Sequence, residues 1–316
     1  MQTEYQALDP VLAPISARLT ESRQCIQPKE PPDLLFHYTN AGGLLGILST
    51  SRIWATNYRF LNDSSEIAYG AAIFEAVVQE RSAQVDSDVI AVFLERTRVT
   101  ANAFDGMFDC YVACFCERDD LLNQWRVYAN AGGGFALGLE TKQIAMRWGD
   151  LRPDQVCFLR KVIYDEALQR KLIAEVLDTT IAALASATQG MSIADANNLI
   201  ARCCQFVRAN TAEYLMCFKH PAFEVEQEWR LCHVTTHREE DHVMFRDGHY
   251  GLTPYVSLDP TPMAGVHTNK LPLTRITHGP TIDPTNVRYA LGKLLGAKGY
   301  AFTEVAGSKL PVRVGL

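Results

Sequence analysis

The order of three segments between residues 33 and 56 constrains the fold more than any other feature. An apolar segment leads into His37, small and aliphatic residues fill 41–50, and a second apolar segment ends at Thr56. This order predicts a strand, a helix and a second strand. His37 then lies at the end of the first strand, next to the pair Gly42-Gly43, where a ligand can approach the backbone closely. On this stretch alone, a purely structural role for His37, as a helix cap or a core residue, stays open.

Composition places the chain among folded proteins with reduced cysteines. The chain has 316 residues, of which 47% are hydrophobic, and its net charge is −6, which argues against disorder and against a broad basic nucleic-acid surface. Most of the nine cysteines lie in apolar runs without the C-x2-C spacing of a zinc site. We therefore expect a cytoplasmic protein that has no metal site. We also expect no signal peptide and no membrane partner, since no basic leader or long apolar run is present.

Both helices and strands recur along the chain, and we expect the α+β class. Residues 1–32 are predicted to form a peripheral N-terminal segment, and residues 33–316 a single domain. Helices within about 165–218 interrupt the strands and predict an inserted helical subdomain, whose expected roles are packing or self-association into a homo-oligomer. The remaining predictions are helices over 64–80, 87–104, 121–129 and 284–297, and strands over 107–116, 135–139, 156–164 and 254–258.

Carboxylates recur at every second position in residues 223–232. If this stretch is a strand, alternation places Glu224, Glu226, Glu228 and Arg230 on one face. Like charges on one face repel, so a partly buried carboxylate here is expected to have a perturbed pKa, as catalytic carboxylates often do. The alternative is a charged edge strand in which Arg230 serves as an ion-pair partner.

Two further groups of residues are candidates for a ligand site. Trp125 and Tyr128 are three residues apart and fall on one face of the predicted helix over 121–129. Asn62 and Asp63 precede the predicted helix over 64–80. They are interpreted either as helix-start residues or as the lining of a pocket opposite His37.

Together these residue types suit a ribose-bearing ligand such as a dinucleotide. A histidine can form hydrogen bonds with ribose hydroxyls, and an aromatic side chain can stack on a flat ring. A carboxylate can stabilise an oxocarbenium-like transition state, as in glycoside cleavage. Nicotinamide is a leaving group that needs no metal, so cleavage of NAD is compatible with these residues.

The chain resembles the DUF2971 family of bacterial proteins over about residues 34–313. Most of the motifs that carry the resemblance are weak singly and specific jointly. They are His37-Tyr38-Thr39, Leu61-Asn62-Asp63 with Glu66, Phe115, Trp125-Arg126, Tyr128-Ala129, Gly133-Gly134-Phe135, Phe218-Lys219-His220-Pro221, Phe223, Glu226-Gln227-Glu228-Trp229-Arg230, Gly279-Pro280, Ser308-Lys309, Pro311 and Arg313.

That family is in turn remotely similar to the ADP-ribosyltransferase superfamily. The resemblance implies split antiparallel β-sheets around an NAD cleft, with NAD as a substrate. It implies that His37 binds ribose, with Tyr38 and Thr39 beside it in the cofactor site, and that Glu228 is the catalytic carboxylate, with Glu226 positioning the acceptor. The residue that stacks on nicotinamide is implied to be Tyr128 or the neighbouring Trp125, with Tyr38 and Tyr69 as competitors.

Basic residues near these motifs have two interpretations. Arg230, Arg313 and Lys219 either bind pyrophosphate or form ion pairs with acidic residues.

The resemblance leaves the acceptor open, which can be a protein, a nucleic acid or a small molecule. One expected function is ADP-ribosyl transfer or NAD hydrolysis by a toxin or an antiphage defence effector. The alternatives are a nucleotide sensor without catalysis, an RNA 2′-phosphotransferase-like enzyme and, against the acidic charge, a nuclease.

Overall fold

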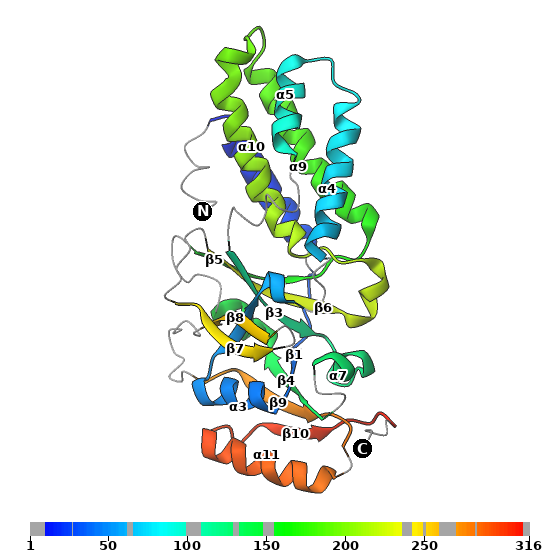
Figure 1. The fold of residues 1–316 in the computed structure, drawn as a ribbon, viewed down its shortest axis with the longest axis vertical. Helices are drawn as coiled ribbons and strands as arrows, with labels where there is room; N and C mark the ends of the chain where they lie inside the picture. The colour runs from blue at the N-terminus through cyan, green and yellow to red at the C-terminus, as the bar shows by residue number, and fades with distance from the viewer. Residues whose placement is uncertain are drawn as a thin grey trace. The chain divides into compact units, whose positions relative to one another are not determined.

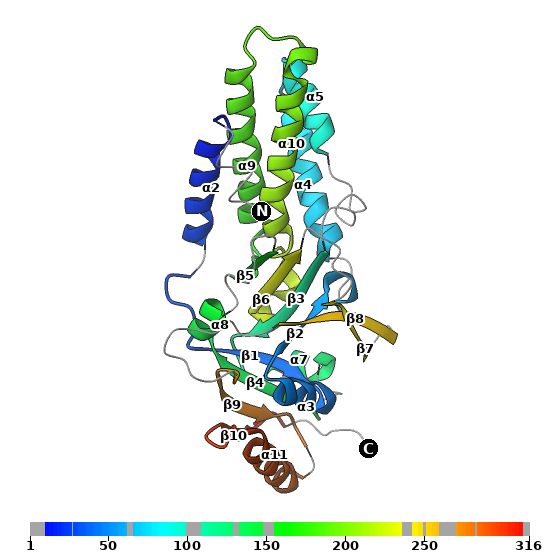
Figure 2. The same cartoon turned by 90° about the vertical axis from the view of Figure 1, so that its left-hand side faces the viewer.

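The structure is a computed structural model in which contacts divide the chain into two compact units (Figures 1 and 2). We call residues 1–29, 62–109 and 162–223 the helical unit, and residues 30–61, 110–161 and 224–316 the sheet unit. The described residues are 10–26, 28–61, 66–98, 109–128, 133–147, 155–235, 242–248, 251–258, 270–281 and 283–311.

The structure describes five α-helices in the helical unit, and α9 and α10 form its central antiparallel hairpin (Figure 2). Apolar residues recur along one side of α9 at helical spacing, and Leu172, Val176 and Leu177 among them are almost completely buried. Ser192 caps α10, since its hydroxyl accepts a hydrogen bond from the Asp195 amide at 3.3 Å. The helices are α2 (Ala13–Ile26), α4 (Glu66–Ser82), α5 (Asp88–Thr97), α9 (Glu166–Ala187) and α10 (Ile193–Leu215). Among the described residues, no helix has both the length and the apolar character needed to cross a membrane.

A single buried amide links three segments of the helical unit. Gln169 is fully buried on α9, and its Nε2 donates to the carbonyl oxygens of Ile163 at 2.6 Å and Lys219 at 3.0 Å. Its Oε1 accepts from the Tyr69 hydroxyl at 2.9 Å. The amide therefore satisfies two carbonyls where the chain enters and leaves the hairpin.

We expect Gln169→Leu to lower the free energy of unfolding by about 2–4 kcal/mol, because the Ile163 and Lys219 carbonyls and the Tyr69 hydroxyl lose their bonds to this amide. The Ile163 carbonyl keeps its bond from the Lys219 amide at 3.2 Å. Urea denaturation of the purified protein measures this loss. Gln79→Ala is the matched control, since Gln79 is an exposed amide on α4 bonded at 3.2 Å to Glu75, and its change should cost less than about 0.5 kcal/mol. Equal costs for the two variants would contradict the linking role of Gln169.

The sheet unit contains a ten-stranded, mostly antiparallel sheet, so the predicted α+β class is confirmed. Its main path runs β10-β9-β4-β1-β3-β2-β8-β7, while β6 pairs with both β3 and β5, and only the pair β9–β10 is parallel among the registers described. The strands are β1 (Leu34–Thr39), β2 (Ile53–Asn57), β3 (Asp109–Cys116), β4 (Phe135–Glu140), β5 (Gln155–Lys161), β6 (Glu228–Thr235), β7 (Met244–Gly248), β8 (Gly251–Leu258), β9 (Leu273–His278) and β10 (Glu304–Gly307).

Short helices complete the sheet unit, and the predicted strand–helix–strand order at residues 33–56 is confirmed. Asn40 caps the first of these helices by accepting from the Gly43 amide at 2.9 Å. Gly46 is required there because a Cβ at this position would lie 2.1 Å from the Trp54 ring. The helices are α3 (Ala41–Thr50), the 3-10 helix η1 (Tyr58–Phe60), α7 (Leu122–Tyr128), α8 (Thr141–Arg147) and α11 (Pro284–Lys298), which lies beside β10 (Figure 1).

The prediction of one strand across 223–232 is wrong in its first half. Residues Pro221–Glu226 form a 3-10 helix, η3, and β6 begins only at Glu228. Between them Gln227 has a positive φ of 46°, a left-handed conformation that interrupts the extended backbone. Glu224 and Glu226 therefore do not share a strand face with Glu228, and the predicted row of three carboxylates does not exist.

Candidate functional site

His37 lies on β1, beside β3, the strand with which β1, β2 and β6 all pair. Strand β3 pairs with β1 at Cys116, with β2 at Tyr111 and Val112, and also with β6. Between the first two pairing points, His37 Nδ1 lies 2.9 Å from the carbonyl oxygen of Cys114. Because a carbonyl can only accept, Nδ1 carries the proton, and Nε2 is the acceptor nitrogen of the neutral ring.

The surroundings keep this ring neutral. Burial lowers the pKa of His37 below its ordinary value of 6.5, and the nearby positive charge of Arg246 lowers this pKa further, against the effect of the Cys114 hydrogen bond. The ring also contacts Phe115, with ring centroids 5.7 Å apart. A neutral imidazole with a fixed tautomer can accept a hydrogen bond from a ligand hydroxyl through Nε2.

We expect the free energy of unfolding to fall as the pH drops below 6.5, more steeply than in His37→Gln. The unfolded chain gains a proton at its His37 near pH 6.5, whereas the folded chain gains it only at the lower pKa, so folding is disfavoured between these values. Urea denaturation between pH 7.5 and 5 gives the difference between the two proteins, and two parallel curves would contradict the lowered pKa.

Tyr38 and Trp125 are parts of a small apolar core rather than open surfaces. The Tyr38 hydroxyl donates to the Arg118 carbonyl at 2.9 Å and accepts from the Leu121 amide at 3.0 Å. Its ring packs edge-on against Trp125 with centroids 4.7 Å apart, and Trp125 is only 1% exposed. Burial raises the pKa of Tyr38, in keeping with a structural hydroxyl. In this structure Trp125 presents no face on which nicotinamide could stack.

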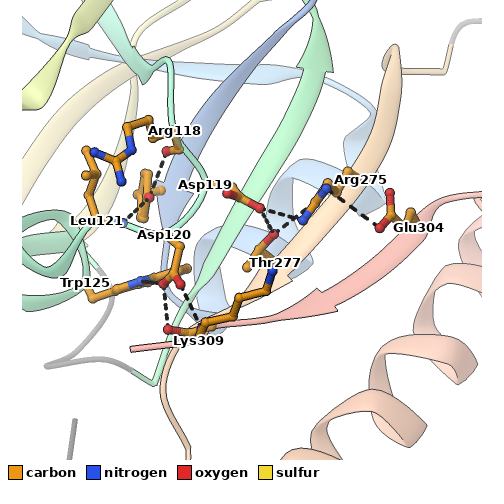
Figure 3. A network of polar contacts seen from close by, with 11 residues as sticks. Arg118, Asp119, Asp120, Leu121, Trp125, Arg275, Thr277, Glu304 and Lys309 are labelled. Atoms are coloured by element: carbon orange, nitrogen blue, oxygen red, sulfur yellow. Dashed lines mark hydrogen bonds and ion pairs between the residues drawn. The ribbon is translucent and has the colours of Figure 1, made fainter. Parts of the chain in front are cut away.

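Two aspartates fix the segment after β3 to the C-terminal strands (Figure 3). Asp120 accepts from Trp125 Nε1 at 2.8 Å, from the Ser308 hydroxyl at 2.6 Å and from the Lys309 amide at 2.8 Å. Asp119 forms an ion pair with Arg275 at 2.9 Å. These contacts explain the Ser308-Lys309 motif as a structural one that holds the chain beside α7.

Glu228 lies at the start of β6 in a buried ion pair. Its carboxylate accepts from Arg230 Nε at 2.8 Å and from Arg230 Nη2 at 3.2 Å, and both side chains are about 95% buried or more. The two residues share a strand face, as predicted, and the next residue, Trp229, points to the other face and donates to Glu117 at 2.8 Å. The ion-pair interpretation of Arg230 is thus the one that the structure shows.

The turn between Glu226 and Glu228 is strained. Gln227 is one of two non-glycine residues with positive φ among the described residues. Such a backbone costs about 1 kcal/mol or more and often occurs at functional sites. Burial raises the pKa of Cys116 to about 12, and the nearby charge of Glu226 adds to this shift, which places Glu226 near the end of β3. Glu226 therefore lies at the end of η3, before the strained residue, and Glu228 lies at the start of β6, after it.

Among the remaining predicted site residues, the structure describes Thr39 in full. Thr39 is buried, and its Oγ1 occupies the space where a Cβ on Gly43 would lie. Asn62, Asp63 and Arg313 lie outside the described residues, as does the side chain of Tyr128. Their predicted roles stay predictions.

The structure also adds a residue that sequence analysis missed. Arg246 on β7 donates to Thr56 Oγ1 at 2.7 Å and lies close enough to His37 to affect its pKa. No local motif marks Arg246, since it is linked to His37 only through the pairing of β7 with β8, of β8 with β2 and of β2 with β3, whose Cys114 carbonyl contacts His37. Within the described part of the chain, no group of three or more His, Cys, Asp or Glu residues is arranged to hold a metal ion.

Comparison with known proteins finds a family model that matches part of the chain. Residues 124–231 match the model of DUF2971, described as a protein of unknown function. The match confirms the predicted resemblance over this segment, which runs from α7 into β6 and contains Trp125, Glu228 and Arg230. No curated protein and no solved structure matches the chain.

Proposed function

We propose that this protein, whose residues 124–231 match the DUF2971 family model, is an NAD-cleaving enzyme that transfers ADP-ribose to an acceptor or to water. The observation that carries the proposal is the neutral His37, whose tautomer is fixed by the Cys114 carbonyl. In this function His37 Nε2 accepts a hydrogen bond from a ribose hydroxyl of NAD.

The topology supports a shared site for His37 and Glu228. β1 meets β3 at Cys116, and the Gln227 carbonyl accepts from the Glu117 amide at 3.3 Å, so β1 and β6 reach the same end of β3. Strands that flank a common neighbour lie about 10 Å apart, which one dinucleotide can span. The proposal includes the finer fold expectation, an ADP-ribosyltransferase-like pair of sheets around an NAD cleft.

Glu228 supplies the negative charge in this mechanism. The bond between the ribose C1′ and the nicotinamide nitrogen breaks, and its electron pair leaves with nicotinamide, which departs neutral. Positive charge develops on the ribose, and the fixed carboxylate of Glu228 stabilises it. A nucleophilic oxygen or nitrogen of the acceptor, or water, then bonds to C1′ and loses a proton. Since Trp125 is buried, the stacking role falls to Tyr128.

A nucleotide sensor without catalysis is the second candidate. The observation in its favour is the bidentate contact of Glu228 with Arg230, which neutralises the carboxylate that catalysis would use. In a sensor, NAD binding would raise the melting temperature without any turnover.

Release of nicotinamide from NAD tests the proposal. We would incubate the protein with NAD alone and with cell lysate, RNA or DNA, and quantify nicotinamide by chromatography. Wild type should release nicotinamide, and Glu228→Gln should release it at least about 100-fold more slowly. Lys293→Gln, a change of an exposed lysine on α11, is the matched control and should behave as wild type. If NAD stabilises wild type without release of nicotinamide, the sensor is favoured. If NAD neither stabilises wild type nor is cleaved, both candidates are refuted.

A further inference from the structure

The guanidinium of Arg246 has no carboxylate partner among the residues that the structure describes. Its Nη2 donates to Thr56 Oγ1 at 2.7 Å. Its Cζ lies 5.8 Å from the ring centroid of Trp54 and 5.6 Å from that of Tyr255. A hydroxyl and two aromatic rings hold this cation in place but leave its charge uncompensated.

The surroundings of Arg246 disfavour its charge in the absence of an anion. Burial lowers the pKa of Arg246, and the only opposing effect is that of Tyr255. Two other arginines of the sheet unit do have carboxylate partners: Arg230 pairs with Glu228, and Arg275 pairs with Asp119. A desolvated guanidinium gains most from an anion that offers several oxygens, as a phosphate does.

Arg246 is positioned by rigid elements close to His37. Arg246 is paired with Thr253 on β8, and β8 is paired with β2 over Ile53–Thr56, which carries Trp54 and Thr56. The two rings that flank the guanidinium are themselves in contact, with centroids 4.9 Å apart. The cation is therefore presented on paired strands, and its charge reaches the His37 ring.

We propose that Arg246, oriented by Thr56, Trp54 and Tyr255, binds a phosphate group of the ligand that His37 contacts through its ribose. The ligand class is then a ribose joined to a phosphate or pyrophosphate, as in ADP-ribose and NAD. The identity of this ligand rests on the proposed function, whereas the anion site rests on Arg246 itself.

Calorimetric titrations with ADP-ribose and with nicotinamide riboside, which lacks phosphate, test this inference. Arg246→Gln should weaken ADP-ribose binding about 10- to 100-fold, the effect of one lost charge-assisted contact. It should change nicotinamide riboside binding less than about twofold. Arg246→Lys keeps the charge without the bidentate geometry and should fall between wild type and Arg246→Gln. Lys293→Gln is again the matched control, and a thermal melt confirms that each variant is folded.

Inorganic pyrophosphate separates this inference from the proposed function. Pyrophosphate binding that is lost in Arg246→Gln but kept in His37→Gln, with no release of nicotinamide by wild type, would refute the proposed function and support the anion site. The inference is overturned if folded Arg246→Gln or Arg246→Lys binds ADP-ribose as tightly as wild type. It is also overturned if wild type binds neither ADP-ribose nor pyrophosphate.

Discussion

Glu228→Ala should lower the free energy of unfolding by about 3–5 kcal/mol, because it leaves the buried guanidinium of Arg230 without this carboxylate. The double variant Glu228→Met/Arg230→Met should be more stable than Glu228→Ala, since it removes both charges and fills their space with apolar atoms. Urea denaturation of the three proteins at pH 7.5 measures both differences.

An exposed ion pair in the sheet unit provides the control for this prediction. Glu304 lies 3.7 Å from Arg275 and its side chain is 64% exposed, so Glu304→Ala should cost less than about 0.5 kcal/mol. If Glu228→Ala cost no more than Glu304→Ala, Glu228 would not be held by a buried pair. The double variant also separates the two roles of Glu228, because it should be folded and yet release no nicotinamide.

Trp125→Ala should cost about 3–5 kcal/mol, because a large side chain that is 1% exposed leaves a cavity in the core around Tyr38. Trp125→Phe should cost about 1–2 kcal/mol, since it keeps an aromatic ring but loses the 2.8 Å bond to Asp120. Tyr289→Ala is the control, because Tyr289 is 68% exposed and its change should be nearly neutral.

Trp125→Phe also distinguishes a core-packing role of Trp125 from a role in stacking on nicotinamide. A core role predicts that Trp125→Phe loses stability and binds NAD as wild type does. The opposite pattern, unchanged stability with weakened NAD binding, would contradict the structural role and restore Trp125 as the stacking residue.

Sequence patterns predicted helices and strands well where buried apolar residues recur at one regular spacing. The helices of the α9–α10 hairpin carry apolar stripes and side-chain caps, and α3 was predicted over the residues that it occupies. The short helix α8 and the edge strand β7 were missed, the latter because its residues are largely exposed and show no apolar alternation.

The candidate site was only partly predictable, because its residues are brought together by pairing between strands that are distant in sequence. The sequence pointed to His37 because a polar residue in an apolar segment is conspicuous, but β1 continues to Thr39, so His37 lies within the strand and not at its end. The alternation across 223–232 was misleading, since Gln227 adopts a left-handed conformation that breaks the strand. Arg246 is distant in sequence from His37, and the two are linked only through the pairing of β7, β8, β2 and β3.

A crystal structure with ADP-ribose bound tests whether His37 contacts the ribose of the ligand. We expect His37 Nε2 about 2.7–3.2 Å from a ribose hydroxyl, with Arg246 in contact with a phosphate oxygen and Glu228 facing the ribose C1′. ADP-ribose bound away from His37, or bound with no contact between the His37 ring and the ribose, would contradict the proposed site.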